Sequence, residues 1–226
     1  MMSSCKEDED DKGIDQSIYL DASEVVGKTA YQVDDNSELL AVFQNDGILK
    51  IASFFNEDGY FFTDNYSYTC DGKIVRTSKE GGIFLVERMS QPYLIACSFE
   101  GYVDIDLPSD GIYVDPQNLK GKTFKVTDSE GNVGSWVINN DGTFKETRVY
   151  ADSQVDVVEN SGSWKIDHNR LNCVYKWENE TEIIDFVFVK DGSKIGMYVV
   201  TKLGYFSNVD FDTKLAELSV KKPVSK

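Results

Sequence analysis

The stretch "RLNCVYKW" (Arg170–Trp177) has an apolar residue at every second position from Leu171 onward. In an extended chain this places those four residues on one face, with Asn172, Lys176 and Glu178 on the other. The apolar set is Leu171, Cys173, Tyr175 and Trp177. Such alternation is typical of an antiparallel strand with one face buried and one face in water.

Other segments repeat this strand signal. "SWVINNDGTF" (135–144) has Trp136 and Ile138 two residues apart, followed by an Asn-Asp-Gly turn. "IIDFVFV" (183–189) and "GMYVV" (196–200) are apolar at nearly every position, which predicts strands covered on both faces. The best helix candidate, "TKLAELSVKK" (213–222), is either a short helix or a frayed last strand. The sequence therefore predicts an all-β chain.

Four pairs of segments recur in the same order in the two halves of the chain. They are "VGKTAYQVDD" (26–35) with "KGKTFKVTDS" (120–129), "NDG" at Asn45 with "NDG" at Asn140, "YTCDGKI" (68–74) with "WKIDHNRL" (164–171), and "GYVDID" (101–106) with "GYFSNVDF" (204–211). The shared order predicts a tandem duplication.

The duplication predicts three regions: a disordered tether over residues 1–24, a first repeat over 25–108 and a second repeat over 117–214. A linker is expected at 107–119, which contains two of the four prolines. Each repeat has room for seven or eight short strands. Because closure removes exposed strand edges, the expected fold is two tandem small antiparallel β-barrels. One larger sandwich built from both halves is the alternative.

Residues of the second half match a known pattern of an opening Leu-x-Gly-Lys, an Asp-Gly-Thr turn and a Gly-x-Trp-x-Ile-Asp-x-x-x-Leu strand pair. They are Leu119, Gly121, Lys122, Asp141, Gly142, Thr143, Gly162, Trp164, Ile166, Asp167 and Leu171. On these residues the half resembles the lipocalin-like domains of Bacteroidetes lipoproteins, although Thr123 occupies the usual Trp position. The first half fits more loosely, through Gly27, Lys28, Asp46, Gly47, Tyr68 and Asp71. The resemblance implies lipocalin-like antiparallel meanders.

The N-terminal stretch "SSCKEDEDDK" (3–12) places Cys5 before an acidic run in a segment that has few apolar residues. It is similar to the mature start of lipoproteins of that phylum, which implies lipid attachment at Cys5 and an outer-membrane lipoprotein, surface-exposed or periplasmic. The stretch lacks the apolar region of a secretory signal. A start codon placed too late would account for this lack, and the alternatives are a cytoplasmic chain, an expression remnant or an arbitrary disordered start.

The formal net charge of −16 argues against sequence-independent nucleic-acid binding, which depends on Lys and Arg neutralising phosphates. It also disfavours adhesion to an anionic membrane surface. No segment approaches the ~20 apolar residues of a membrane-spanning helix. The expected contact with a membrane is therefore the lipid anchor alone.

Residue types that carry catalysis are sparse. The single histidine, His168, is expected at a hairpin turn. The acidic stretch 104–115 departs from a calcium loop because Pro108 stands at the third ligand position. Cys70 and Cys97 are either a disulfide pair or buried free thiols. The sequence therefore predicts no enzyme, no cofactor and no metal site, and a glycoside hydrolase that uses two of the 39 acidic residues is a distant alternative.

Aromatic side chains are the candidate binding residues. The adjacent Tyr60, Phe61 and Phe62 cannot all point the same way on a strand, so one side of this triplet faces solvent, a ligand or another domain. The candidate ligand-binding residues are Tyr60, Phe62, Tyr66, Trp136, Trp164 and Tyr175.

Two functions follow. The first is a non-enzymatic, surface-anchored lipoprotein that binds a small apolar ligand, a glycan or a protein partner through its barrels. The second is a structural or accessory subunit of an envelope protein complex without a small ligand.

Overall fold

The computed structural model describes residues 19–34, 36–56, 59–78, 82–88, 91–110, 112–149, 157–167, 169–176 and 180–220. Within these residues the regular structure is strand, apart from one α-helix and short 3-10 turns, so the predicted all-β class is confirmed. No helix in this part of the chain has the length and apolar character to cross a membrane.

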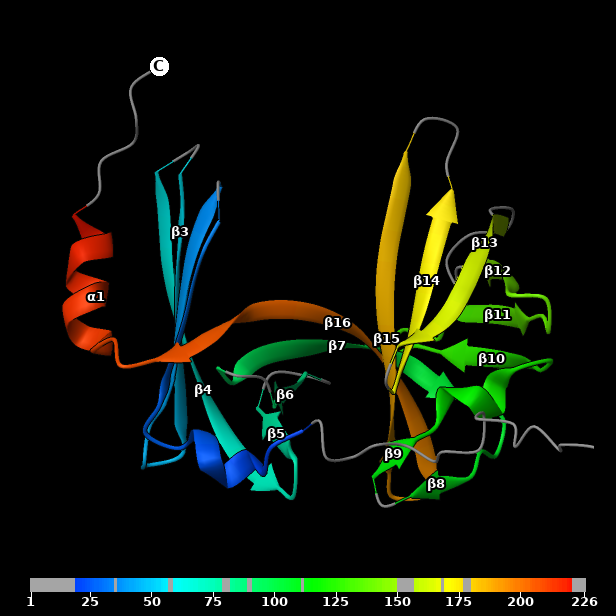
Figure 1. The fold of residues 1–226 in the computed structure, drawn as a ribbon, viewed down its shortest axis with the longest axis horizontal. Helices are drawn as coiled ribbons and strands as arrows, with labels where there is room; N and C mark the ends of the chain where they lie inside the picture. Colours follow the sequence, from blue (N-terminus) through cyan, green and yellow to red (C-terminus); the bar gives the residue numbers. More distant parts are fainter. Residues whose placement is uncertain are drawn as a thin grey trace, which may run out of the picture. The chain divides into compact units, whose positions relative to one another are not determined.

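The chain forms two compact units, called here the terminal unit and the central unit (Figure 1). The terminal unit contains the described residues of 19–99 and 199–220, and the central unit those of 100–198. These bounds come from spatial contacts. The repeat bounds of 25–108 and 117–214 come from sequence likeness and stay a prediction.

The terminal unit is built from consecutive antiparallel hairpins. Its elements are the 3-10 turn η3 (Ala22–Val25), strands β1 (Thr29–Val33), β2 (Ser37–Phe43), β3 (Ile48–Phe55), β4 (Tyr60–Asp71), β5 (Ile74–Thr77) and β6 (Ile83–Glu87), and the helix α1 (Phe211–Ser219). Each of the strands β1 to β6 pairs with the next along the chain.

The central unit follows the same plan. Its elements are β8 (Ser109–Asp110), β9 (Tyr113–Val114), the 3-10 turn η4 (Pro116–Leu119), β10 (Thr123–Thr127), β11 (Val133–Ile138), β12 (Thr143–Val149), β13 (Val157–Asp167), β14 (Arg170–Lys176) and β15 (Thr181–Asp191). The strands β10 to β15 pair in order.

Two long strands, β7 (Tyr93–Val103) and β16 (Lys194–Ser207), belong to both units. The first half of β7 pairs with β6, and its end pairs with β10 at Val103 and Tyr102. Likewise the end of β16 pairs with β1 in the terminal unit. Since β7 also pairs with β16, the antiparallel sheet closes in a ring.

A glycine in each long strand allows a close approach of the facing strand. A Cβ on Gly101 would lie 2.6 Å from the Thr127 carbonyl oxygen, and a Cβ on Gly204 would lie 2.8 Å from the Tyr31 carbonyl oxygen. Their φ angles of +149° and +146° are also ones that other L-residues rarely adopt. Glycine is therefore needed at 101, where β7 pairs with β10, and at 204, where β16 pairs with β1.

The expected linker at 107–119 is instead folded structure of the central unit. Leu107 is buried, and β9 is buried and pairs with β15 through Tyr113 and Val189. Pro116 begins η4, and the Asp115 side chain caps this turn by accepting the Gln117 N–H at 2.9 Å. Linker composition was misleading because prolines are also favoured at the first position of a helical turn.

Packed structure also begins before residue 25 in the terminal unit. Tyr19, Leu20 and Ala22 are buried, and Tyr19 forms an isolated bridge with Glu87. The Leu20 N–H donates to the Val86 carbonyl at 2.9 Å. The apolar residues near the start of the chain thus belong to the fold.

The burial of the predicted strands and the type of the C-terminal element can be compared with the sequence patterns. Leu171, Cys173 and Tyr175 are buried as predicted, whereas Asn172, expected on the solvent face, is also buried, and Trp177 lies outside the described residues. The predicted two-sided burial holds for 186–189 and 196–198 but is wrong for Ile183, which is 63% exposed, and is incomplete at 199–200. The C-terminal candidate is a helix. Phe211, Leu215 and Leu218 lie on the helix face that packs beside strands β2 and β3 (Figure 1).

Dividing the chain between β8 and β9, into residues 1–110 and 111–226, is expected to abolish folding of each fragment alone. The first fragment lacks β16, so β1 loses a neighbour, and the second lacks β7, so β10 loses one. Circular dichroism and size-exclusion chromatography should show unfolded or aggregated fragments that recover structure when co-expressed. A monomeric fragment with cooperative thermal unfolding would contradict the shared-strand arrangement.

Candidate functional site

The interior of the central unit is filled by stacked aromatic rings. Trp136 stacks between Phe124 and Phe144, with centroid distances of 6.2 and 5.7 Å, and Tyr175 meets Phe144 edge to face at 4.9 Å. Trp136 and Tyr175 are 2% and 3% exposed. Two predicted binding residues therefore lie together here, as parts of a packed core.

A buried polar layer lies next to these rings. Glu146, only 1% exposed, accepts hydrogen bonds from Arg148 Nε at 2.5 Å, from Asn160 Nδ2 at 3.2 Å and from the Tyr175 hydroxyl at 3.2 Å. Strand register explains the grouping, because Trp136, Glu146 and Asn160 stand directly opposite one another across β11, β12 and β13. Three donors satisfy this carboxylate and offset the cost of burying its charge.

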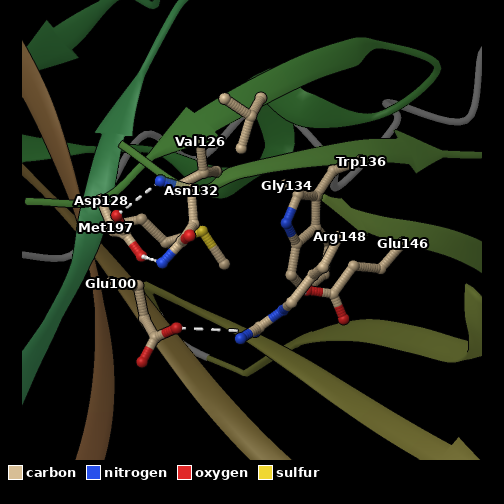
Figure 2. Close-up of a pocket in the computed structure, with 10 residues that line it drawn as sticks. Glu100, Val126, Asp128, Asn132, Gly134, Trp136, Glu146, Arg148 and Met197 are labelled. Carbon is tan, nitrogen blue, oxygen red and sulfur yellow. Dashed lines mark hydrogen bonds and ion pairs between the residues drawn. The ribbon is translucent and has the colours of Figure 1, made fainter. Parts of the chain in front are cut away.

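The polar layer opens into a small cleft of about 60 Å³ in the central unit (Figure 2). Glu100, Trp136 and Arg148 face it with polar groups, and Val126 and Met197 face it with apolar ones. Arg148 Nη2 lies 3.5 Å from Glu100 Oε2, so one guanidinium bridges two glutamates. The volume suits a small chemical group and is below the ~300 Å³ of a drug-sized site.

The pKa values of two carboxylates beside the cleft are shifted in opposite directions. Burial raises the pKa of Glu100, Arg148 opposes this rise, and the charges of Glu146 and Asp128 add to it. Asp128 has a lowered pKa: partial burial opposes the shift, but N–H groups of Asn132 and Glu130 donate to its carboxylate in the β10–β11 turn. Glu100 is therefore the carboxylate whose ionisation costs stability.

Glu100→Gln is expected to increase the free energy of unfolding at neutral pH. A raised pKa in the folded state means that the stability which protonated Glu100 contributes is lost as pH rises above the ordinary value of 4.5. The gain should disappear below that pH, where the native side chain is neutral in both states. Denaturant unfolding from pH 3 to 8, with the exposed Glu180→Gln as control for the charge change, measures this. A gain that does not depend on pH would contradict the assignment.

The terminal unit has a larger pocket, of about 350 Å³, called here the tyrosine pocket. Its lining residues are Tyr31, Gln32, Val33, Glu87, Tyr93, Lys202 and Tyr205. The Tyr93 and Tyr205 rings meet edge to face with centroids 4.4 Å apart, and the Tyr93 hydroxyl donates to Gln32 Oε1 at 3.0 Å. Burial and the neighbouring Tyr205 raise the pKa of Tyr93, which keeps its hydroxyl protonated. Tyr205 is 44% exposed, so it remains partly open to solvent beside Tyr93.

A cluster of exposed rings also lies at one end of β3 and β4. Phe55, Tyr60 and Phe62 have centroids 6.2 to 6.3 Å apart, and Tyr60 is 59% exposed. Phe61 packs instead on the opposite face, against the core beneath α1. The predicted splitting of the aromatic triplet is thus observed, with Tyr60 and Phe62 together.

The two other predicted aromatic residues make internal hydrogen bonds. The Tyr66 hydroxyl donates to Asp64 Oδ2 at 2.7 Å, and the ring packs on the terminal core. Trp164 donates through Nε1 to the Asn139 carbonyl at 3.0 Å. These contacts stabilise turns and core, and they bring neither residue to a pocket described above.

Side chains that could ligate a metal ion are not gathered in the described ranges. No cluster of three or more His, Cys, Asp or Glu side chains there suits a metal ion. Asp104 accepts the Lys125 N–H at 2.6 Å, so it has a structural contact. Cys70 and Cys97 are free thiols, which excludes the disulfide alternative. His168 and Cys5 lie outside the described residues.

Of the residues that line the two cavities, sequence reasoning identified Trp136 in the cleft and missed the others. Glu146 and Arg148 had a readable signal, since they alternate with Phe144 on "TFKETRV" and so share its buried face. Tyr93 and Tyr205 had none, because they meet through strands over a hundred residues apart in the chain.

Comparisons with known proteins give no relative. The chain matches no protein-family model, no curated protein and no solved structure.

Proposed function

We propose that the protein is a non-enzymatic binding lipoprotein whose tyrosine pocket takes a hydroxyl-rich ligand of the glycan class. The observation that carries this proposal is the partly exposed Tyr205, braced by Tyr93, within a pocket of about 350 Å³. That volume lies in the range of small-molecule sites.

The chemistry of the pocket favours a glycan over an apolar ligand. Gln32, Glu87 and Lys202 contribute hydrogen-bonding groups around the tyrosine rings. A sugar presents both C–H faces, which suit rings, and hydroxyl groups, which suit amide and charged side chains. The alternative site for an apolar ligand, the interior of the central unit, is filled by aromatic rings.

Equivalent contacts support a duplicated, lipocalin-like pair of barrels as the scaffold of this function. Tyr68 donates its backbone N–H to Gly47 at 2.8 Å, and Trp164 donates to Gly142 at 2.8 Å. Each aromatic side chain also donates to the carbonyl three residues before that glycine. The glycines have φ angles of +81° and +84°. Two turns built with the same bonds are expected from two copies of one ancestral unit.

The accessory-subunit function is the second candidate, and the exposed rings of Phe55, Tyr60 and Phe62 favour it. Aromatic rings are enriched at the centres of protein interfaces. In this case the partner is an envelope protein, and the binding energy resides in the ring cluster instead of the tyrosine pocket.

Tyr205→Ala is expected to weaken saccharide binding by roughly tenfold or more, because truncation of an anchoring tyrosine removes most of its contact energy. Saturation-transfer NMR of the full chain with a panel of neutral mono- and oligosaccharides measures this. Ile183→Ala, at a side chain that is 63% exposed in the central unit, is the control and should bind normally. Absence of binding to any saccharide, together with a stable co-purifying protein whose binding needs Tyr60 and Phe62, would replace this proposal by the second candidate.

The proposed membrane anchor is the Cys5 lipid. Cys5→Ala is expected to move the protein from the membrane fraction to the soluble fraction in its native host, because alanine cannot carry the acyl chains. With Cys5 present, two or three acyl chains would hold the protein on the membrane far more firmly than one. Fractionation and immunoblotting check this, with Cys70→Ala as a control because Cys70 lies on β4. Unchanged partition of Cys5→Ala would remove the anchor from the proposal.

A further inference from the structure

We propose that the cleft of the central unit is a second binding site, specific for an amide group and in particular for the acetamido group of an N-acetylated sugar. The site lies in a different unit from the tyrosine pocket and uses none of its residues. It therefore stands or falls separately from the proposed function.

The first observation is an open hydrogen-bond donor on the floor of the cleft. Trp136 is 98% buried, yet its indole Nε1 makes no hydrogen bond to another residue of the described chain. The nitrogen lies under Gly134, where a Cβ would sit 3.5 Å away. Figure 2 shows this nitrogen on the cleft side of the ring. A ligand that reaches it must present an acceptor, such as a carbonyl oxygen.

The second observation is an open acceptor across the cleft. Glu100 has a single ion-pair contact within the described residues, the 3.5 Å approach of its Oε2 to Arg148. Its other oxygen is left to accept a hydrogen bond, and its side chain is 28% exposed. Figure 2 places this carboxylate and the indole nitrogen on different sides of the same cleft. The ligand therefore has to donate as well as accept, which an amide does with its N–H and C=O.

The third observation is the shape and polarity of the walls. Val126, Val133 and Met197 supply apolar surface beside the two polar groups. A volume of about 60 Å³ exceeds the ~10 to 15 Å³ that one water needs, but it is too small for a sugar ring. An acetamido group meets these limits, because its methyl packs on the apolar wall and the attached ring stays at the mouth.

Other ligand classes fit less well. A carboxylate or phosphate would face Glu100, Glu146 and Asp128, which outnumber Arg148. An alkylammonium ion would place its donors against the indole N–H and the guanidinium, which are also donors. A hydroxyl group could satisfy both polar partners but would leave the apolar wall uncovered.

The test follows the Trp136 indole N–H in ¹⁵N-resolved NMR spectra of the full chain. N-Acetylglucosamine is expected to shift this resonance in a saturable manner, and glucose at the same concentration is expected to leave it unchanged. An equal shift with glucose would show hydroxyl recognition, and no shift with either sugar would show an unused cleft. Either result overturns the proposal.

Gly134→Val supplies the matched variant. The added side chain meets only ordinary van der Waals neighbours at its Cβ, so the fold should persist while the cleft over the indole is filled. Binding of N-acetylglucosamine should weaken by at least about tenfold. Ser135→Val, which adds bulk on the opposite face of β11, should bind normally. Retained binding in Gly134→Val, or loss of the indole shift in Tyr205→Ala, would overturn the proposal. If Gly134→Val does not fold, the comparison of the two sugars on the native chain still decides.

Discussion

Backbone hydrogen bonding along β7 and β16 is the constraint on which the rest of the fold depends. An unpaired strand edge exposes a row of N–H and C=O groups to water and to other chains. Each long strand supplies one end to a second ladder, so β1 and β10 gain a neighbour that their own hairpins do not provide. Glycines at 101 and 204 permit these crossings, because any larger residue would meet the facing backbone. Residues of β7 and β16 also line the two cavities. Glu100 and Met197 line the cleft of the central unit, and Tyr93 and Tyr205 line the tyrosine pocket of the terminal unit.

Burying the charged groups of the polar layer costs desolvation free energy in the central unit. Replacing a buried ion pair by apolar residues of similar size is often neutral or stabilising, so such a layer is weak as a device for stability alone. Glu146 is fully satisfied, but Glu100 has a raised pKa and only a long contact with Arg148. A group that is held at a cost beside an opening is a recurrent sign of a site that binds something.

Local pattern was sufficient for the class of fold and for the orientation of single strands. The burial of Leu171, Cys173 and Tyr175 follows from alternation alone, as does the division of Tyr60 and Phe62 from Phe61. The pairing of strands far apart in the chain could not be predicted from the sequence. Period-two alternation indicates which face of a strand is buried, but it does not indicate which strand pairs with it. For the same reason Tyr93 and Tyr205 gave no signal of a shared pocket. Composition was actively misleading at 107–119, where proline and aspartate serve a capped turn and not a flexible connection.

The position of β16 in the chain has a consequence for biosynthesis. Residues 205–207, which pair with β1, are synthesised more than 170 residues after β1. The strands of the central unit have all emerged by then, so that unit is able to close while the terminal unit still lacks an edge partner. The terminal unit is therefore expected to complete its sheet after the central unit, although β1 is synthesised before the central strands. A chain with this delay leaves the edge of β1 unpaired until β16 has been made.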